Sequence, residues 1–343
     1  MKNKNTIINS TIFILLIIIT YIIIFKNSNL LNIYNQISKL NIIYILLAIL
    51  TMFLYFLIES INIKNILTFL KEKISLKNAL KYTFIGYFFS SITPASTGGQ
   101  PMEIYYMSKD KIKISNATIA ILIYLSGHHI ASVTIGIISI ILNPNILNSN
   151  LLIIFIIGNL LNTIPIILTL IGIFKENIVT KLSNIIVKLL NFIKYKNKDN
   201  LIKKLDIELK NYTKSAKFIK ENKHQFFKAI LISFIHVTVY YSVPYFIYKA
   251  FNLNNFSILK FIELQSILHS TVCSIPLPGS VGANEAVFLL VYNKIYNKSL
   301  LESAMLINRF ISFYLFVIIS LSIVIINKIK FKKRNIIRKN QQN

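Results

Sequence analysis

The sequence predicts an all-α polytopic membrane protein, a bundle of helices that crosses the bilayer several times. Hydrophobic residues make up 54% of the 343 residues and charged residues only 15%, whereas a soluble globular chain has about 25% charged residues. The apolar residues also gather in runs of about twenty, a length that crosses a hydrocarbon layer of about 30 Å as a helix. A water-soluble domain of this size would have too little polar surface, so that class is excluded.

Eight apolar segments follow one another, and six of them are expected to be full crossings: residues 7–25, 42–61, 117–142, 151–174, 229–251 and 304–326. The other two, 80–108 and 261–293, are interrupted by clusters of Pro, Gly, Ser and Thr. Before the first interruption, residues 82–93 would rise only about 18 Å as a helix, which is too little to span. Each interrupted segment is therefore predicted to be a re-entrant hairpin.

Lysine placement sets the predicted topology, because short cytoplasmic loops carry the excess of Lys and Arg. With both hairpins re-entrant, one face holds Lys2, Lys4, the lysines from Lys64 to Lys81 (Lys77 among them), the fourteen lysines of residues 175–228 and the basic tail 328–343. The other face receives the lysine-free loop 143–150. A full crossing by the first interrupted segment would move the fourteen-lysine loop away from Lys2 and Lys4. Both termini are therefore expected to be cytoplasmic.

The same order of segments occurs twice within a single membrane domain, residues 1–327. Two spans, a hairpin and a span occupy residues 1–142, and the order recurs over 151–327 from the other side of the membrane, with the basic loop 175–228 as an insertion. Both interruptions contain Pro-x-x-x-Gly, followed by an acidic residue. Inverted repeats with broken helices that meet near the midplane are the layout of many secondary transporters.

The basic loop contains a second pattern. From Ile178 to Ile193, apolar residues recur at helical spacing with lysines between them. This pattern is typical of a helix that lies in the headgroup region and attracts anionic lipid. A solvated basic linker is the alternative interpretation.

The two interruptions are the best candidates for a ligand site, because non-helical backbone at membrane depth is tolerated only in buried or water-filled places. Gly98, Gly99, Gly279 and Gly282 allow close approach of a ligand to backbone, and free amides at the start of the next half-helix favour an anionic group such as a lipid phosphate. The remaining candidates at the interruptions are polar side chains or the proline that opens the second one: Thr93, Ser96, Thr97, Gln100, Pro278, Ser280 and Asn284. Alternatively, the interruptions are helix breaks that only permit packing.

Ionisable residues inside spans are costly and usually functional. Arg309, one of three arginines, lies early in the final span, and its guanidinium could grip phosphate or carboxylate through two parallel bonds. Glu103 and Glu285 are expected to counter a cationic headgroup, to pair with Arg309, or to pair with nearby lysines. Glu59 is expected to be interfacial, and a snorkelling Arg309 is the alternative to a ligand.

The sequence gives little indication of a metal site, a cofactor site or a nucleic-acid partner. His128 and His129 are adjacent, so they point in different directions, and His236 and His269 are isolated in the sequence. We interpret these histidines as satisfied bundle residues, with a proton relay as the alternative. The single cysteine, Cys273, excludes a disulfide framework and a thiolate cluster. The formal charge of +26 is assigned to the membrane rather than to a nucleic acid, and no metal or cofactor is predicted.

The two interruptions resemble a known family. Residues 91–101, with the sequence SITPASTGGQP, residues 276–286, with the sequence PLPGSVGANEA, and Arg309 are similar to the lysylphosphatidylglycerol synthase transmembrane-region family. This family is also called flippase-like, and it includes the membrane half of the multiple peptide resistance factor. The resemblance extends over nearly the whole chain.

The resemblance implies a plasma-membrane protein that binds or transports an anionic or aminoacylated phospholipid, such as lysyl-phosphatidylglycerol. It also implies a contribution to resistance to cationic antimicrobial peptides. Two-part family members carry a large soluble transferase domain after the last span, whereas this chain has about sixteen residues there. Translocation, with a separate lysyl-lipid synthase as the partner that supplies the lipid, is therefore the leading hypothesis. A phosphatidylglycerol lysyltransferase and a translocase for a polyprenyl-linked sugar are the alternatives. The oligomeric state is open.

Overall fold

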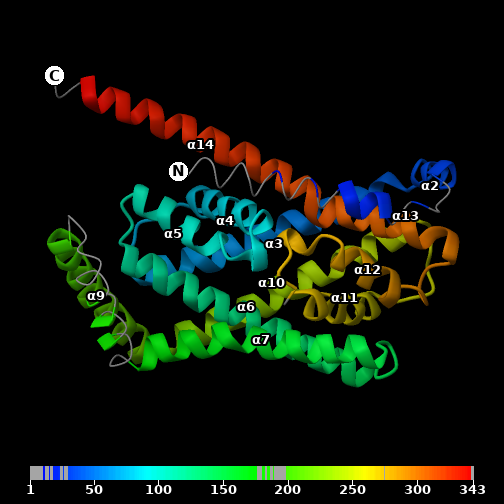
Figure 1. Ribbon diagram of the computed structural model, residues 1–343, viewed down its shortest axis with the longest axis horizontal. Coiled ribbons are helices and arrows are strands. Elements are labelled where there is room, and N and C mark those ends of the chain that lie inside the picture. Colours follow the sequence, from blue (N-terminus) through cyan, green and yellow to red (C-terminus); the bar gives the residue numbers. More distant parts are fainter. Residues whose placement is uncertain are drawn as a thin grey trace.

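The protein is a helical bundle in the computed structural model, which describes residues 18–23, 30–175, 198–273 and 275–340 together with positions 11, 15, 26, 180–181, 184–185 and 188. Every regular element in these ranges is a helix, and they contain no strand. The predicted all-α class is confirmed. Figure 1 shows long helices stacked side by side, with α7 (Ser149–Phe174) and α14 (Leu315–Asn340) on opposite sides of the bundle.

Within the described ranges, five helices are long and apolar enough to cross a membrane. They are α3 (Ile42–Phe69), α6 (Ile114–Leu142), α7, α10 (Lys223–Ala250) and the final rod formed by α13 (Lys298–Arg309), the π-helical turn η3 (Phe310–Tyr314) and α14. They match five of the six predicted crossings. Of the first, 7–25, the structure describes positions 11, 15 and 18–23, which are helical, and the rest lies outside the described residues.

Both interrupted segments are broken helices, as predicted. In the first, α4 (Leu76–Ser91) is followed by the short 3-10 turn η1 (Pro94–Ser96) and by α5 (Gly99–Lys109), which packs back on α4. In the second, α11 (Ile258–Val272), η2 (Pro278–Ser280) and α12 (Ala283–Val291) repeat the arrangement. Their re-entry into a bilayer stays a prediction.

Helices α3 and α10 pack against each other along much of their length and hold the bundle together. The buried amide of Asn62 on α3 donates hydrogen bonds to the carbonyl of Ala229 (3.0 Å) and to Ser233 Oγ (3.1 Å) on α10. On α6, a Cβ at Gly127 would lie 2.6 Å from Ser233 Oγ, so α6 also approaches α10 closely. Helix α3 precedes the first broken helix and α10 precedes the second, so this contact places the two broken segments in one bundle. The inverted repeat itself stays a prediction.

The long basic loop contains helix α9 (Lys198–Glu221), which packs against α6 and α7. Ser215 Oγ donates to Asn116 Oδ1 over 2.7 Å, and the backbone N–H of Ser115 donates to Glu208 Oε2 over 3.1 Å. Loop and bundle are therefore joined by specific contacts. The headgroup helix predicted for 178–193 lies mostly outside the described residues.

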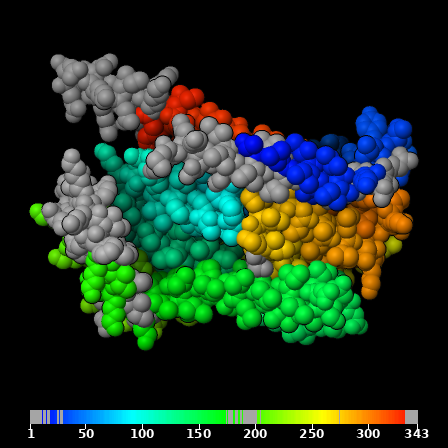
Figure 2. Space-filling model, in the orientation of Figure 1, coloured from blue at the N-terminus to red at the C-terminus, as the bar shows by residue number. Residues whose placement is uncertain are grey.

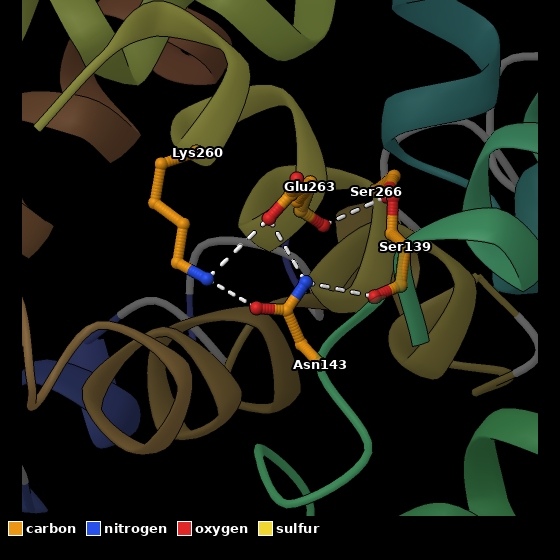
Figure 3. A network of polar contacts seen from close by, with 5 residues as sticks. All are labelled: Ser139, Asn143, Lys260, Glu263 and Ser266. Carbon is orange, nitrogen blue, oxygen red and sulfur yellow. Dashed lines mark hydrogen bonds and ion pairs between the residues drawn. The ribbon is translucent and has the colours of Figure 1, made fainter. Parts of the chain in front are cut away.

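A polar network joins the end of α6 to the start of α11 (Figure 3). Asn143 Nδ2 donates to the carbonyl of Ser139 and to Glu263 Oε2, both at 2.9 Å. Lys260 bonds Asn143 Oδ1 and lies 3.4 Å from Glu263 Oε2, and Ser266 Oγ donates to Ser139 Oγ over 2.8 Å. The network fixes the helix that leads into the second break.

The described helices expose large apolar side chains on their outer faces. On α7, for example, Leu160 is 62% exposed and Leu168 is 58% exposed. Water would penalise such a surface, whereas acyl chains accept it. The chain is therefore a multi-pass membrane protein, in agreement with the sequence analysis.

Candidate functional site

The two breaks meet at the middle of the molecule. Turns η1 and η2 contact each other, and Figure 2 shows the cyan segment that carries the first break beside the gold segment that carries the second. Each turn begins with a proline and then enters the left-handed region, at Ala95 and Ser96 (φ 50° and 54°) and at Gly279 and Ser280 (φ 58° and 50°). Left-handed backbone is uncommon for residues other than glycine. The chain therefore adopts the same strained shape twice, at one place.

The first turn is held by its own residues. Thr93 Oγ1 accepts a hydrogen bond from the backbone N–H of Gly98 (2.9 Å) and donates to the carbonyl of Phe89 (2.7 Å). A Cβ at Gly99 would lie only 2.8 Å from the carbonyl oxygen of Gly86, so glycine is needed where α5 crosses α4. These three candidate residues, Thr93, Gly98 and Gly99, build the turn.

The second turn is held by a buried ion pair. Arg309 Nε donates to Glu285 Oε1 over 2.8 Å, and the two side chains are 5% and 0% exposed. The other carboxylate oxygen of Glu285 accepts from the backbone N–H of Gly282 (2.7 Å), and Arg309 also donates to the carbonyl of Gly279. The guanidinium lies 4.1 Å from the centre of the Phe313 ring. Of the predicted partners for Arg309, the structure selects Glu285.

A cavity of about 530 Å³ opens beside both turns. Eight of the fourteen predicted site residues line it: Ser96, Thr97, Gln100, Glu103, Gly279, Ser280, Asn284 and Arg309. The other six are absent from its wall and instead shape the turns or the half-helices next to them: Thr93, Gly98, Gly99, Pro278, Gly282 and Glu285. The candidates therefore divide into wall residues and supporting residues. Ligand binding by the wall residues stays a prediction.

The cavity wall includes Glu59 and His128, which the sequence analysis did not place at the site. The expectation of an interfacial Glu59 is wrong: the residue is 8% exposed, and its Oε2 lies 3.6 Å from Nε2 of the buried His236. The prediction fails because Glu59 lies where α3 faces α10, inside the bundle. Its position within an apolar span was the available signal.

Histidines that are separate in the sequence converge in space. The ring centre of His128 lies 5.5 Å from that of His236 and 6.2 Å from that of His269, and His236 stacks on Tyr55 at 4.0 Å. His269 Nδ1 is hydrogen-bonded to the hydroxyls of Tyr241 (3.0 Å) and Ser132 (3.2 Å), as expected for a satisfied bundle histidine. His128 Nδ1 and both ring nitrogens of His236 have no hydrogen-bond partner among the described residues. The expectation of satisfied histidines therefore fails for His236.

The wall has an excess of acidic groups. Glu285 neutralises Arg309, whereas no ion pair among the residues that the structure describes joins Glu59 or Glu103, which line the cavity, to an arginine or lysine. Glu103 is 6% exposed, and its Oε2 has no hydrogen-bond partner within the described ranges. No group of three His, Cys, Asp or Glu side chains in those ranges is arranged to hold a metal ion. The arrangement suits an organic ligand that carries both hydrogen-bond acceptors and a cationic group.

The fold and this cavity define a class: a multi-pass membrane protein in which two broken helices enclose a polar, partly acidic cavity inside an apolar bundle. The family is shown by a family model, described as the lysylphosphatidylglycerol synthase TM region, which matches residues 7–320. The chain belongs to this family, and the resemblance seen in the sequence is confirmed. It is thereby a membrane protein associated with the lysyl-phosphatidylglycerol pathway. No curated protein matches the chain.

Proposed function

We propose that the protein binds aminoacylated phosphatidylglycerol, such as lysyl-phosphatidylglycerol, in the central cavity and moves it between the leaflets of the plasma membrane. One observation carries the proposal: the cavity wall combines Arg309 and polar residues of the two turns with the acidic side chains of Glu59 and Glu103. This combination suits a headgroup that has a phosphate and an ammonium group.

The phosphate would lie at the turns. A guanidinium has five N–H donors, and the contacts with Glu285 and Gly279 occupy two of them. Arg309 lines the cavity together with Ser280 and Asn284, and the side-chain donors of these residues suit phosphate oxygens. Because Glu285 balances the charge of Arg309, the binding there would depend on hydrogen bonds as well as on charge.

The ammonium group would lie at the carboxylates. Burying ionised carboxylates without a cation is costly, so a cationic ligand would stabilise Glu59 and Glu103. His128 in the wall and His236 behind it, whose Nε2 lies 3.6 Å from Glu59 Oε2, are titratable groups close to this acidic part. Unmodified phosphatidylglycerol lacks the cation and would be bound more weakly.

For movement, the two predicted repeats would rock against each other around the paired turns and open the cavity to one side at a time. Both termini would be cytoplasmic, and a separate synthase would supply the lipid. The result would be a less negative outer surface, which reduces the attraction of cationic antimicrobial peptides.

Displacement of a fluorescent lysyl-phosphatidylglycerol from the purified protein tests this proposal. Glu59→Gln and Glu103→Gln should each weaken lysyl-phosphatidylglycerol binding about tenfold, because a hydrogen bond to a charged group contributes roughly 1.5–3 kcal/mol. Binding of phosphatidylglycerol should stay within about twofold. Glu221→Gln, at an exposed position on α9, is the matched control. Equal affinity of the wild type for both lipids would contradict the proposal.

A further inference from the structure

A second cavity lies between the first part of α4 and the middle of α14. Its volume is about 520 Å³, and none of its lining residues belongs to the central cavity. Its polar wall consists of Lys77, Asn78, Lys81, Asp110, Asn327 and Lys330. Five apolar side chains from α4 and α14 form the remainder. We call this cavity the α4–α14 groove.

Asp110 is already engaged within the groove. Its Oδ2 forms an ion pair with Lys81 and accepts a hydrogen bond from the hydroxyl of Tyr82 at 2.7 Å. The Lys81 ammonium also lies 4.5 Å from the centre of the Tyr82 ring. These contacts fix the loop after α5 against α4, and they neutralise the charges of Lys81 and Asp110.

The positive charge that is left comes from both sides of the groove. Lys77 lies in the first turn of α4 and Lys330 on α14, both are exposed, and no ion pair between described residues involves either of them. Three lysines against one aspartate give the lining a net charge of two positive units. The first turn of α4 contains no acidic residue that would oppose an anion, and a helix N-terminus favours negative charge.

The apolar part of the groove continues into the outer face of the bundle. Leu80 and Ile323 line the groove, and one turn before Ile323 and Lys330 on the same side of α14, Ile319 and Ile326 are 36% and 50% exposed. Phe331 also lines the groove, and its ring centre lies 5.9 Å from that of Tyr106 on α5. A ligand there would meet two lysines at its head and an apolar surface along its tail.

We propose that the α4–α14 groove is a binding site for an anionic phospholipid, with the phosphate between Lys77 and Lys330 and the acyl chains along α14. Basic pockets between membrane helices at the cytoplasmic level suit such headgroups. The predicted topology assigns both lysines to the cytoplasmic side, and the structure brings them to one groove. The site is separate from the central cavity, and it does not depend on the function proposed for that cavity.

Native mass spectrometry of the full-length protein in detergent micelles tests the site by counting retained lipids. With phosphatidylglycerol, the wild type should retain one lipid more than Lys77→Gln/Lys330→Gln, because each lysine near a membrane surface changes affinity about fivefold and the pair about 25-fold. Phosphatidylcholine should show no such difference. Lys77→Arg/Lys330→Arg keeps the charge and should bind like the wild type.

Lys223→Gln/Lys228→Gln is the matched control, since both lysines are exposed on α10, lie outside the groove and are predicted on the same membrane face. It should retain as much phosphatidylglycerol as the wild type. Equal retention by Lys77→Gln/Lys330→Gln and the wild type would overturn the proposal. Loss of the extra lipid in an excess of inorganic phosphate would also overturn it, because the site would then recognise free phosphate.

Discussion

Removing Glu285 gives the sharpest test of how the second turn is held. In Glu285→Ala, Arg309 keeps its place but loses the carboxylate at 2.8 Å, and the backbone N–H of Gly282 loses its acceptor. Arg309 is 4% exposed, so water cannot easily replace the carboxylate. The variant therefore leaves a buried charge without its partner, beside the site.

The size of the effect follows from this burial. Breaking a buried ion pair by removing one partner costs about 3–5 kcal/mol. At roughly 2–4 °C per kcal/mol for a large domain, the midpoint of thermal unfolding should fall by about 6–20 °C. Replacing both partners with apolar side chains is often close to neutral, so Glu285→Leu/Arg309→Met should recover much of the loss.

Cys273 provides the assay, because it is the only cysteine of the chain and lies half-buried where α11 ends, close to the second turn. A thiol-reactive dye that fluoresces on labelling reports when this region opens during heating. The matched control is Glu221→Ala, which removes an exposed carboxylate of α9. It should change the free energy of unfolding by less than about 0.5 kcal/mol. A cost of less than about 1 kcal/mol for Glu285→Ala, or a still lower midpoint for Glu285→Leu/Arg309→Met, would show that the ion pair does not hold the turn.

Three other predictions concern packing and use the same measurement. Gly99→Ala should cost about 1–3 kcal/mol, because its Cβ would lie 2.8 Å from the Gly86 carbonyl oxygen. Gly172→Ala is the control and should leave the midpoint nearly unchanged, because among the described residues its Cβ would approach the movable hydroxyl of Tyr212, at 2.7 Å. Equal midpoints for the two variants would argue against a close crossing of α4 and α5. Gly279→Ala should be worse than Gly99→Ala, since φ is +58° and its Cβ would lie 2.3 Å from the Phe313 ring; a wild-type midpoint would show that the turn relaxes freely. Asn62→Leu should cost about 1–3 kcal/mol through the two lost hydrogen bonds between α3 and α10, and an unchanged midpoint would exclude their contribution.

The spans and the two breaks could be predicted because each has a local signal. Apolar runs mark the bilayer-crossing parts, and the clusters around Pro94 and Pro278 mark the places where helices stop. Helix ends were less accessible: α3 continues to Phe69, beyond the predicted end at 61, and α10 begins at Lys223, before the predicted start at 229. Hydropathy marks only the apolar part of a helix, whereas the backbone ladder continues into polar residues.

The composition of the cavity could be predicted only in part. The turn residues and Arg309 are visible in the sequence because glycine, proline and a buried cation are unusual inside apolar segments. The meeting of Glu59 with His236 depends on how α3 packs against α10, and no local pattern encodes a contact between residues so far apart in the chain. For the same reason the sequence left several partners open for Arg309, and only the packed structure selects Glu285.

The proposed function requires that the cavity beside the two turns accepts an aminoacylated phospholipid and lets it cross the bilayer. A leaflet-resolved assay of labelled lysyl-phosphatidylglycerol in proteoliposomes tests it most directly. We expect faster transfer than in empty vesicles, a rate reduced severalfold by Glu59→Gln at unchanged thermal stability, and a wild-type rate for Glu221→Gln. Transfer by the folded wild-type protein at the rate of empty vesicles would contradict it.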